Sequence, residues 1–325
     1  MAMRSDATLL LIDGPTVDEV LDPDAVGRAV VEAFTLHSAS KGRVFPVVRE
    51  QLPSGGIFGI KSGDVPSQSL LGFKAAGFWP ANRAQGGEPH QATILLFDPA
   101  TGRPSCVIDG NSITTARTGA AGAVGLTKLA RPDSTCVAVF GTGVQARSQL
   151  RHALRALPSI RDVVYLSHDR QPNAGFESEF ASRCRIASAH DANAAVSSSD
   201  IVITATPGAG PLFDADAVRP GTHLNCVGAD TRGKRELPDG VLQRSTLFVD
   251  DRQQAAALGE LQWAPALSCT EIGEVLAGNG AWNRDPSDVT VFDMTGLALQ
   301  DLTTARVVFE RAEASGLGQR IAWPW

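Results

Sequence analysis

One strand-to-helix turn near the middle of the chain limits the possible folds more than any other segment. The apolar run 136–140 has no polar alternation, and Gly141, Thr142 and Gly143 follow it directly. Such a run is typical of a strand buried on both faces of a parallel sheet. Similar short runs alternate with helical stretches, near 163–166, 201–205, 223–227, 247–249 and 289–292. The repeated units predict an α/β fold with a doubly wound sheet of the Rossmann type.

The glycine spacing at this turn matches the fingerprint of dinucleotide-binding domains. Gly141 would make the turn, Gly143 would let a pyrophosphate approach the backbone, and Ala146 would let the helix pack closely on the strand. Free N–H groups at the helix start favour a negatively charged ligand. A tight turn without a ligand is the alternative, but the strand and helix around it favour a dinucleotide. The residues expected to contact this cofactor are Gly141, Thr142, Gly143, Val144, Gln145, Thr118, Asp169, Arg170, Thr206, Val227 and Gly228.

The end of the next predicted strand bears on which nicotinamide cofactor binds. An acid there would hold the ribose 2′-hydroxyl of NAD, whereas a basic residue would accept the extra phosphate of NADP. The sequence places Asp169 between His168 and Arg170. We favour NAD(H), with NADP(H) as the alternative.

The composition argues against several other classes of protein. The chain has 325 residues, with 29 Lys and Arg against 35 Asp and Glu and a net charge of −6. Without a basic field, we do not expect it to bind nucleic acid. No apolar run reaches the ~18 residues of a membrane span, and residues 1–6 do not resemble a signal peptide, so we expect a cytoplasmic protein. The 5 cysteines form no CxxC pair and the 6 histidines show no ligand spacing, so we expect neither disulfides nor a metal.

The length predicts two domains, because a single core rarely grows this large. Residues 1–118 contain mostly strand patterns, including a hairpin across 93–108, and predict an α+β domain. Residues 119–296 hold the repeated strand–helix units. The tail 297–314 has the pattern of one amphipathic helix.

Three charged residues stand out from apolar or small-residue surroundings. Lys74 is a lone charge on an apolar strand, where an exposed edge lysine is the alternative. Arg117 is the only charge between Asp109 and Lys128, and its guanidinium would bind a carboxylate at two points unless it joins the domains by a salt bridge. Asp230 follows a predicted parallel strand, where doubly wound sheets place ligand chemistry, with a loop turn as the alternative. These groups suit an enzyme that holds an acid substrate and moves a proton.

The chain resembles the ornithine cyclodeaminase/mu-crystallin family over nearly its whole length. The motifs that carry the resemblance are residues 89–97, 109–118, the glycine turn, 221–237 and 292–301. The resemblance implies a homodimer with a Rossmann domain at 119–296. It also implies a substrate-binding and dimerisation domain at 1–118 that the helix in 297–325 completes. Members of the family reduce, or form and consume, an imine of a 2-oxo acid.

The resemblance also implies roles for single residues. By motif position, Lys74 matches the family lysine near the substrate, and Arg117 matches the carboxylate-binding arginine. Asp230 matches the acid/base aspartate. Arg49 matches the second basic residue on the carboxylate, with Arg43 as the competing assignment.

One departure from the family pattern bears on the substrate. Where members usually carry Met-Pro, this chain has Lys61 within 58–63. A cation there, in addition to Arg49, Lys74 and Arg117, exceeds the need of one carboxylate, unless Lys61 is an exposed loop lysine. The segments 45–50, 59–61 and 77–80 resemble the iminosuccinate reductases of the family, whose substrate has two carboxylates. His90 either faces the substrate or satisfies a turn.

We therefore expect NAD(P)H-dependent reduction of a 2-imino acid, with iminosuccinate giving L-aspartate. The alternatives are a reductase of cyclic ketimines, an alanine-type dehydrogenase and an ornithine cyclodeaminase. A non-catalytic NADP-binding protein like mu-crystallin is a further alternative. The full set of Lys74, Arg117 and Asp230 argues against it, since a binding module needs no acid/base residue.

Overall fold

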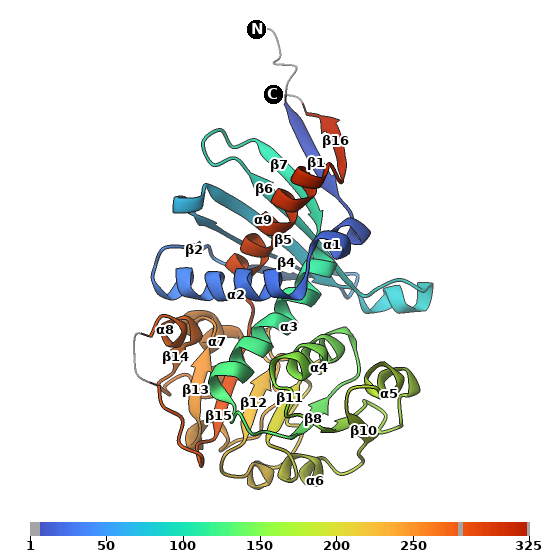
Figure 1. The fold of residues 1–325 in the computed structure, drawn as a ribbon, viewed down its shortest axis with the longest axis vertical. Helices are drawn as coiled ribbons and strands as arrows, with labels where there is room; N and C mark the ends of the chain where they lie inside the picture. Colours follow the sequence, from blue (N-terminus) through green and yellow to red (C-terminus); the bar gives the residue numbers. More distant parts are fainter. Residues whose placement is uncertain (1–6, 279–281, 324–325) are drawn as a thin grey trace. The chain divides into compact units, whose positions relative to one another are not determined.

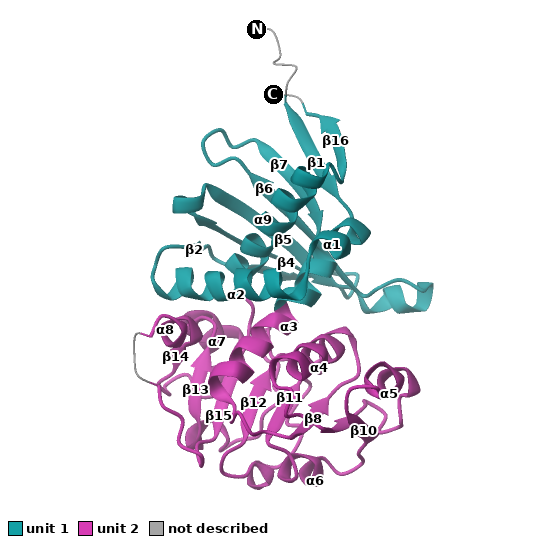
Figure 2. Ribbon diagram, in the orientation of Figure 1, with its two compact units in different colours: residues 1–117, 297–325 teal, residues 118–296 magenta. Residues whose placement is uncertain are grey.

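The chain divides into two compact units, each with its own sheet (Figure 2). The computed structural model describes residues 7–278 and 282–323. Unit 1 comprises Met1–Arg117 and Leu297–Trp325, and unit 2 comprises Thr118–Gly296. The division predicted from the sequence lies one residue further along, after 118. No helix in the described part of the chain is both long and apolar enough to span a bilayer.

Unit 1 is built on an eight-stranded sheet in the order β16-β1-β7-β6-β5-β4-β2, with β3 paired to β4 (Figure 1). All neighbours are antiparallel except β1 and β7, which run parallel. The strands are β1 (Thr8–Ile12), β2 (Arg43–Val44), β3 (Val48–Gln51), β4 (Ile57–Val65), β5 (Leu70–Phe78), β6 (His90–Phe97), β7 (Pro104–Asp109) and β16 (Gln319–Ala322).

The helices of unit 1 are α1 (Gly14–Val20), α2 (Pro23–Ser38) and α9 (Ala298–Ser315). The first two begin where Asp13 and Asp22 accept hydrogen bonds from backbone N–H groups, and each has a proline in its first turn. Helix α9 packs on β4, β5 and β6 and against α2. The C-terminal segment therefore supplies part of the core of unit 1.

Two glycines of the sheet lie next to α9. Gly63 on β4 and Gly72 on β5 are paired across the strands. A Cβ at Gly72 would lie 2.8 Å from Cδ2 of Leu302, and one at Gly63 would lie 3.4 Å from Cδ2 of Leu299. A larger residue at Gly72 would therefore hold the helix away, whereas a Cβ at Gly63 would make ordinary contact with the helix and clash first with the backbone carbonyl of Arg43 on β2.

Unit 2 is a fully parallel sheet, which confirms the predicted doubly wound fold (Figure 1). Its order is β10-β9-β8-β11-β12-β15-β13-β14, so the chain crosses from β10 back over β8 to reach β11. This reversal is a topological switch point, where open α/β sheets bind ligands. The strands are β8 (Cys136–Phe140), β9 (Asp162–Leu166), β10 (Arg185–Ser188), β11 (Ile201–Thr204), β12 (His223–Cys226), β13 (Thr246–Val249), β14 (Thr270–Glu271) and β15 (Thr290–Asp293).

Helix α3 (Gly110–Leu129) crosses the division between the units, and its second half packs in unit 2. A Cβ at Gly122 would lie 1.9 Å from Oε1 of Gln149 on α4. The small residues of α3 are therefore required by the close packing of these two helices. The other helices of unit 2 are α4 (Val144–Ala156), α5 (Ala174–Phe180), α6 (Ala192–Ser197), α7 (Arg252–Leu258) and α8 (Ile272–Leu276).

Several elements differ from the sequence-based expectation. Helix α1 and strands β10, β14 and β16 were not predicted, because each is short and takes its definition from its neighbours. Helix α9 is not amphipathic in its first half, since residues 298–305 are all buried. Those buried residues include Asp301, Thr303 and Thr304.

Shortening Leu302 tests whether the C-terminal helix completes unit 1. Its side chain is fully buried against β5, so Leu302→Ala should lower the free energy of unfolding by about 2–5 kcal/mol. Urea denaturation measures this change. Glu310→Ala, at an exposed position of the same helix, should stay within about 0.5 kcal/mol of the wild type. Equal small effects of both substitutions would contradict the packing described here.

Candidate functional site

The residues at the switch point of unit 2 form a cradle suited to a dinucleotide. Gly141 follows β8 with a φ of 108°, a conformation that other residues rarely adopt. A Cβ at this position would lie 2.7 Å from the carbonyl oxygen of Ala205, which follows the neighbouring strand β11. Glycine is thus required both by the turn and by the closeness of the two strand ends.

The start of α4 is open to an anion. A Cβ at Gly143 would meet no atom within 4 Å, so a ligand can approach its backbone. No side chain caps the helix, which leaves its first N–H groups without a side-chain acceptor. Val144 is 52% exposed beside them. These observations fit the pyrophosphate of a dinucleotide, which such helix starts bind.

A buried carboxylate, which was not identified from the sequence, holds the ends of strands β11 and β12 together. Oε1 of Glu236 accepts hydrogen bonds from the N–H and hydroxyl of Thr206, at 2.7 and 2.6 Å, and Oε2 accepts one from the N–H of Gly228 at 2.8 Å. Burial raises the pKa of Glu236, and these donors oppose that rise. Two predicted cofactor residues, Thr206 and Gly228, are therefore positioned by one side chain, and Val227 lies between β12 and Gly228.

Glu236 is itself held by a second buried acid. Glu260 accepts hydrogen bonds from the backbone N–H groups of Glu236 and Leu237. Burial, together with the nearby Asp293, raises the pKa of Glu260 to about 8, and burial raises that of Asp293 to about 7. The backbone of Glu236 and Leu237, in the loop between β12 and β13, is therefore held in place by the buried side chain of Glu260.

Asp230 lies on the same loop, after β12. Its Oδ1 accepts hydrogen bonds from Nζ of Lys234 at 2.7 Å and from the hydroxyl of Thr231 at 3.1 Å. The loop is further tied down by Gln262, which accepts from the N–H of Gly233 at 2.7 Å. The half-buried carboxylate of Asp230 is thus held in place with a cation beside it.

The residues expected to choose between NAD and NADP lie in the turn after β9. Asp169 is exposed, and its Oδ1 accepts hydrogen bonds from the hydroxyl of Ser167 and the N–H of Gln171. These bonds hold the pKa of Asp169 below its ordinary value. Arg170 has a φ of 60° and is half-buried. On α3, Thr118 is buried, and its carbonyl accepts a hydrogen bond from Gln149.

Unit 1 contains a buried cluster of charged side chains beneath α9. Nζ of Lys74 on β5 donates to Oδ1 of Asp301 at 2.8 Å and to the hydroxyl of Thr114 at 3.2 Å. Nε of Arg117 on α3 donates to the same Asp301 oxygen at 3.1 Å. Lys74 is 4% exposed, Arg117 7% and Asp301 0%. Lys74 is therefore no exposed edge lysine, and the salt bridge of Arg117 lies within unit 1.

Lys61 extends this cluster to three cations. It lies opposite Lys74 in the antiparallel register of β4 and β5, so both side chains point to the same face of the sheet. Lys61 is 8% exposed and lies on a strand, which rules out an exposed loop lysine. Burial lowers the pKa of Lys74 to about 7; Asp301 opposes this effect, and the charges of Arg117 and Lys61 add to it. Three buried cations close to one another suit an anionic ligand.

The other predicted substrate residues lie on further strands of the same sheet. Arg49 is half-buried on β3. Arg43 is exposed, and its guanidinium binds Asp64 on the neighbouring strand. The guanidinium of Arg43 is therefore already bound to a carboxylate of the protein itself. His90 begins β6, and its Nδ1 lies 2.9 Å from Oδ1 of Asn111 on α3.

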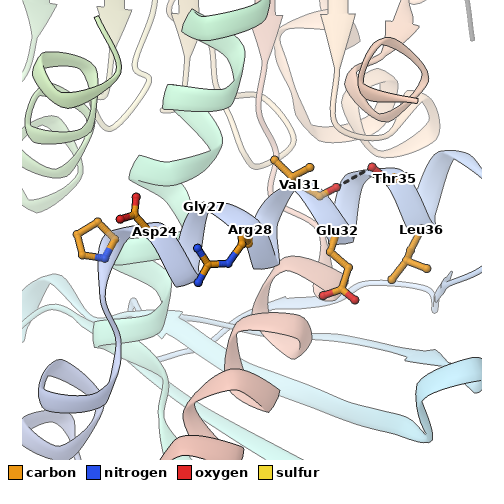
Figure 3. A pocket seen from close by; sticks show the side chains of 8 residues that line it. Asp24, Gly27, Arg28, Val31, Glu32, Thr35 and Leu36 are labelled. Carbon is orange, nitrogen blue, oxygen red and sulfur yellow. Dashed lines mark hydrogen bonds between the residues drawn. The ribbon is translucent and has the colours of Figure 1, made fainter. Parts of the chain in front are cut away.

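One hollow in unit 1 lies apart from all these side chains. Residues 23–36 of α2 line it, among them Arg28, Val31 and Glu32 (Figure 3). None of the predicted site residues contributes to it. Within the described residues, no three His, Cys, Asp or Glu side chains are arranged to hold a metal ion. The roles assigned to Asp230, Lys74, Arg117, Arg49, Lys61 and His90 stay predictions.

Asp301 and Glu236 are the main residues that sequence reasoning passed over. Both lie in motifs noted there, 292–301 and 221–237. For Asp301 the available signal was an acid among mostly apolar residues, which is uncommon unless the acid is paired, whereas Glu236 lies among charged residues and gave no such signal. Their partners come from distant segments, so no local pattern identified them.

Comparison with known proteins agrees with the geometry. The model of the ornithine cyclodeaminase/mu-crystallin family matches residues 16–316. Iminosuccinate reductase of Paracoccus denitrificans is 31% identical over 328 residues, which cover 96% of this chain and 99% of that protein. Alanine dehydrogenase of Archaeoglobus fulgidus is 33% identical over 319 residues, which cover 96% and 98%.

Solved structures are similar over the same extent. An archaeal alanine dehydrogenase dimer with bound NAD has a TM-score of 0.91 and 31% identity, and the match covers 98% of this chain and 100% of that one. The iminosuccinate reductase of P. denitrificans in complex with NAD+ has a TM-score of 0.88, 31% identity and the same coverage. The family model covers most of the chain, and the relatives match it over nearly their full length. The chain therefore belongs to the ornithine cyclodeaminase/mu-crystallin family.

Proposed function

We propose that this protein is an NAD(P)H-dependent reductase of a 2-imino acid, and that it converts iminosuccinate to L-aspartate. The observation that carries the proposal is the buried cluster of unit 1. Lys61, Lys74 and Arg117 are buried close to one another, and Asp301 binds Lys74 and Arg117. Ammonium and guanidinium groups brought together in this way favour a carboxylate ligand, which an imino acid substrate supplies.

NAD(H) is the cofactor we propose, with NADP(H) as the alternative. Gly141, Thr142, Gly143 and the start of α4 would hold its pyrophosphate, while Thr206 and Gly228 would line the nicotinamide end. When bound, the reduced cofactor supplies the hydride that adds to the imine carbon. Relatives crystallised with NAD support this choice.

The protein's own groups would bind the substrate and supply the proton. Arg117 and Arg49 would bind the α-carboxylate, and the Lys74 ammonium would donate a hydrogen bond at the imine end. Asp230 would pass a proton to the imine nitrogen, so that the C=N bond becomes CH–NH. Lys234, 2.7 Å from Asp230, would stabilise the carboxylate left behind.

Lys61 supports a substrate with two carboxylates. Its ammonium lies opposite Lys74 on the neighbouring strand and is buried with it. In this scheme Arg117 and Arg49 already bind the α-carboxylate of the substrate. Lys61 would be the cation that binds a second, distal carboxylate, and iminosuccinate has one.

An alanine dehydrogenase is the second candidate. It is favoured by the 33% identity to the A. fulgidus enzyme and the TM-score of 0.91 to an archaeal alanine dehydrogenase. Its substrate has one carboxylate, so Lys61 would then lack an anionic substrate group. That difference separates the two candidates.

We also propose that two copies of the chain associate as a homodimer. On the face opposite Lys74, unit 1 carries the half-buried apolar residues Phe73 on β5 and Leu95 and Phe97 on β6. Phe73 and Phe97 stack at 5.9 Å between ring centroids. An apolar sheet face of this kind is typical of an interface. Light scattering that gives the mass of a single chain would contradict the proposal.

Oxidation of NADH by the purified protein tests the proposed reaction. Oxaloacetate with ammonium forms iminosuccinate in solution, and pyruvate with ammonium forms the imine of alanine. We expect NADH oxidation that requires ammonium and is faster with oxaloacetate, followed by absorbance at 340 nm. Faster oxidation with pyruvate would favour an alanine dehydrogenase. No oxidation with either acid, also when NADPH replaces NADH, would overturn the proposed function.

Asp230→Asn tests the proton donor. The amide cannot donate a proton as an acid does, so turnover should fall by well over tenfold, while NADH binding, measured by fluorescence titration, stays within about twofold. A turnover within about tenfold of the wild type, equal to ~1.4 kcal/mol, would remove Asp230 from this role. Asp216→Asn, at an exposed position of the same unit that has no assigned role, should leave turnover unchanged.

Lys61→Met tests the distal carboxylate. The ratio of kcat/KM for oxaloacetate over pyruvate, each with ammonium, should fall by at least about tenfold, or ~1.4 kcal/mol. Lys41→Met, at an exposed position, is the matched control and should leave the ratio unchanged. Equal losses on both substrates would show that Lys61 does not contact a second carboxylate.

A further inference from the structure

Asp301 connects the two cations that the proposed reaction needs. Its Oδ1 accepts hydrogen bonds from Lys74 on β5 and Arg117 on α3, while Asp301 itself lies in the first turn of α9. The carboxylate is fully buried, and its Oδ2 accepts no hydrogen bond among the described residues. The side chain of Asp301 thus joins three segments of unit 1, namely β5, α3 and its own helix α9.

The charges around Lys74 act in opposite directions. Lys61 on β4 and Arg117 on α3 repel its ammonium, and Asp301 on α9 attracts it. Thr114 on α3 accepts a hydrogen bond from it but carries no charge. The same cations hold the pKa of Asp301 below its ordinary value, although burial alone would raise it. Asp301 is therefore the negative group that offsets the repulsion between Lys74 and the two neighbouring cations.

We propose that Asp301 is a positioning residue for the reaction, which keeps the Lys74 ammonium charged and holds Lys74 and Arg117 in a fixed relation. The proposal rests on the proposed function, because it concerns the groups that would bind the imino acid. Asp301 touches neither substrate nor cofactor in this scheme. It acts through Lys74 and Arg117 alone.

The pH dependence follows from the sign of the interaction. Burial lowers the pKa of Lys74 to about 7, and Asp301 keeps it from falling further. A lysine loses its charge as the pH rises through its pKa. Activity that needs the ammonium is therefore lost on the alkaline side, and without the Asp301 charge it is lost at lower pH.

The first test compares pH profiles of kcat/KM. In Asp301→Asn the alkaline limb should shift to lower pH by about 1 unit or more, the effect of removing one close opposite charge. Thr304→Val is the matched control, since Thr304 is buried on the same helix and its hydroxyl has no hydrogen-bond partner among the described residues. Its limb should stay where the wild type has it. An unshifted limb in Asp301→Asn would overturn the proposal.

Two further variants separate positioning from general support of the fold. Asp301→Glu keeps the charge, so its alkaline limb should stay near that of the wild type even where kcat falls. In the Lys74→Met background, Asp301→Asn should lower kcat/KM far less than it does with Lys74 present, because groups that act as a unit are not additive. Full additivity of the two losses would show that Asp301 does not act through Lys74.

A measurement without turnover distinguishes failure of this inference from failure of the proposed function. NMR of protein labelled with ¹³C-lysine follows the titration of the Lys74 side chain, whose signal is assigned by its loss in Lys74→Met. We expect the midpoint in Asp301→Asn to lie about 1 unit or more below that in the wild type. Equal midpoints would overturn the inference. A shifted midpoint in a protein without imine reductase activity would overturn only the proposed function.

Discussion

The buried ion pairs of Asp301 are the interaction on which unit 1 depends most. They join a central strand, the helix that leads into unit 2, and the C-terminal helix that returns to the sheet. Removing one partner from a buried pair typically costs about 3–5 kcal/mol, because the remaining charge has no counter-ion. Replacing all partners of a buried ion pair by apolar residues is often neutral for stability, so folding alone does not require this cluster.

In unit 2, too, buried carboxylates connect segments, here the loops that follow the strands. Glu236 ties the loop after β11 to the loop after β12, and Glu260 holds the backbone of Glu236 in turn. A Cβ at Gly228 would lie 2.5 Å from the Glu236 carboxyl group, so glycine is needed for this approach. In each unit a buried acid thus positions residues that were predicted from the sequence to bind a ligand: Asp301 positions Lys74 and Arg117.

Glu236 does the same for Thr206 and Gly228. In our proposal the positioned residues contact the ligand, and the two acids do not.

Much of the fold and part of the candidate site followed from the sequence. The strand run at 136–140, the glycines after it and the repeated units predicted a parallel sheet, because burial on both faces leaves an unmistakable apolar pattern. Lys74, Arg117 and Asp230 were singled out because a charge in an apolar or small-residue stretch needs a reason. The short elements β10, β14 and β16 were missed, since two to four residues carry no period of their own. Asp301 was missed because its partners lie on β5 and α3, far away in the sequence.

The sequence by itself determined the fold class, the family and the dinucleotide fingerprint. These depend on local properties, namely which residues can make a tight turn, fill a parallel sheet or leave a helix start open. Only the tertiary structure decided that Lys61 is buried beside Lys74, that Arg43 is engaged by Asp64, and that Asp301 binds both Lys74 and Arg117. The reason is physical: these interactions depend on distances between side chains, and those distances are set by how the strands pair and by how closely α9 packs on the sheet at Gly72.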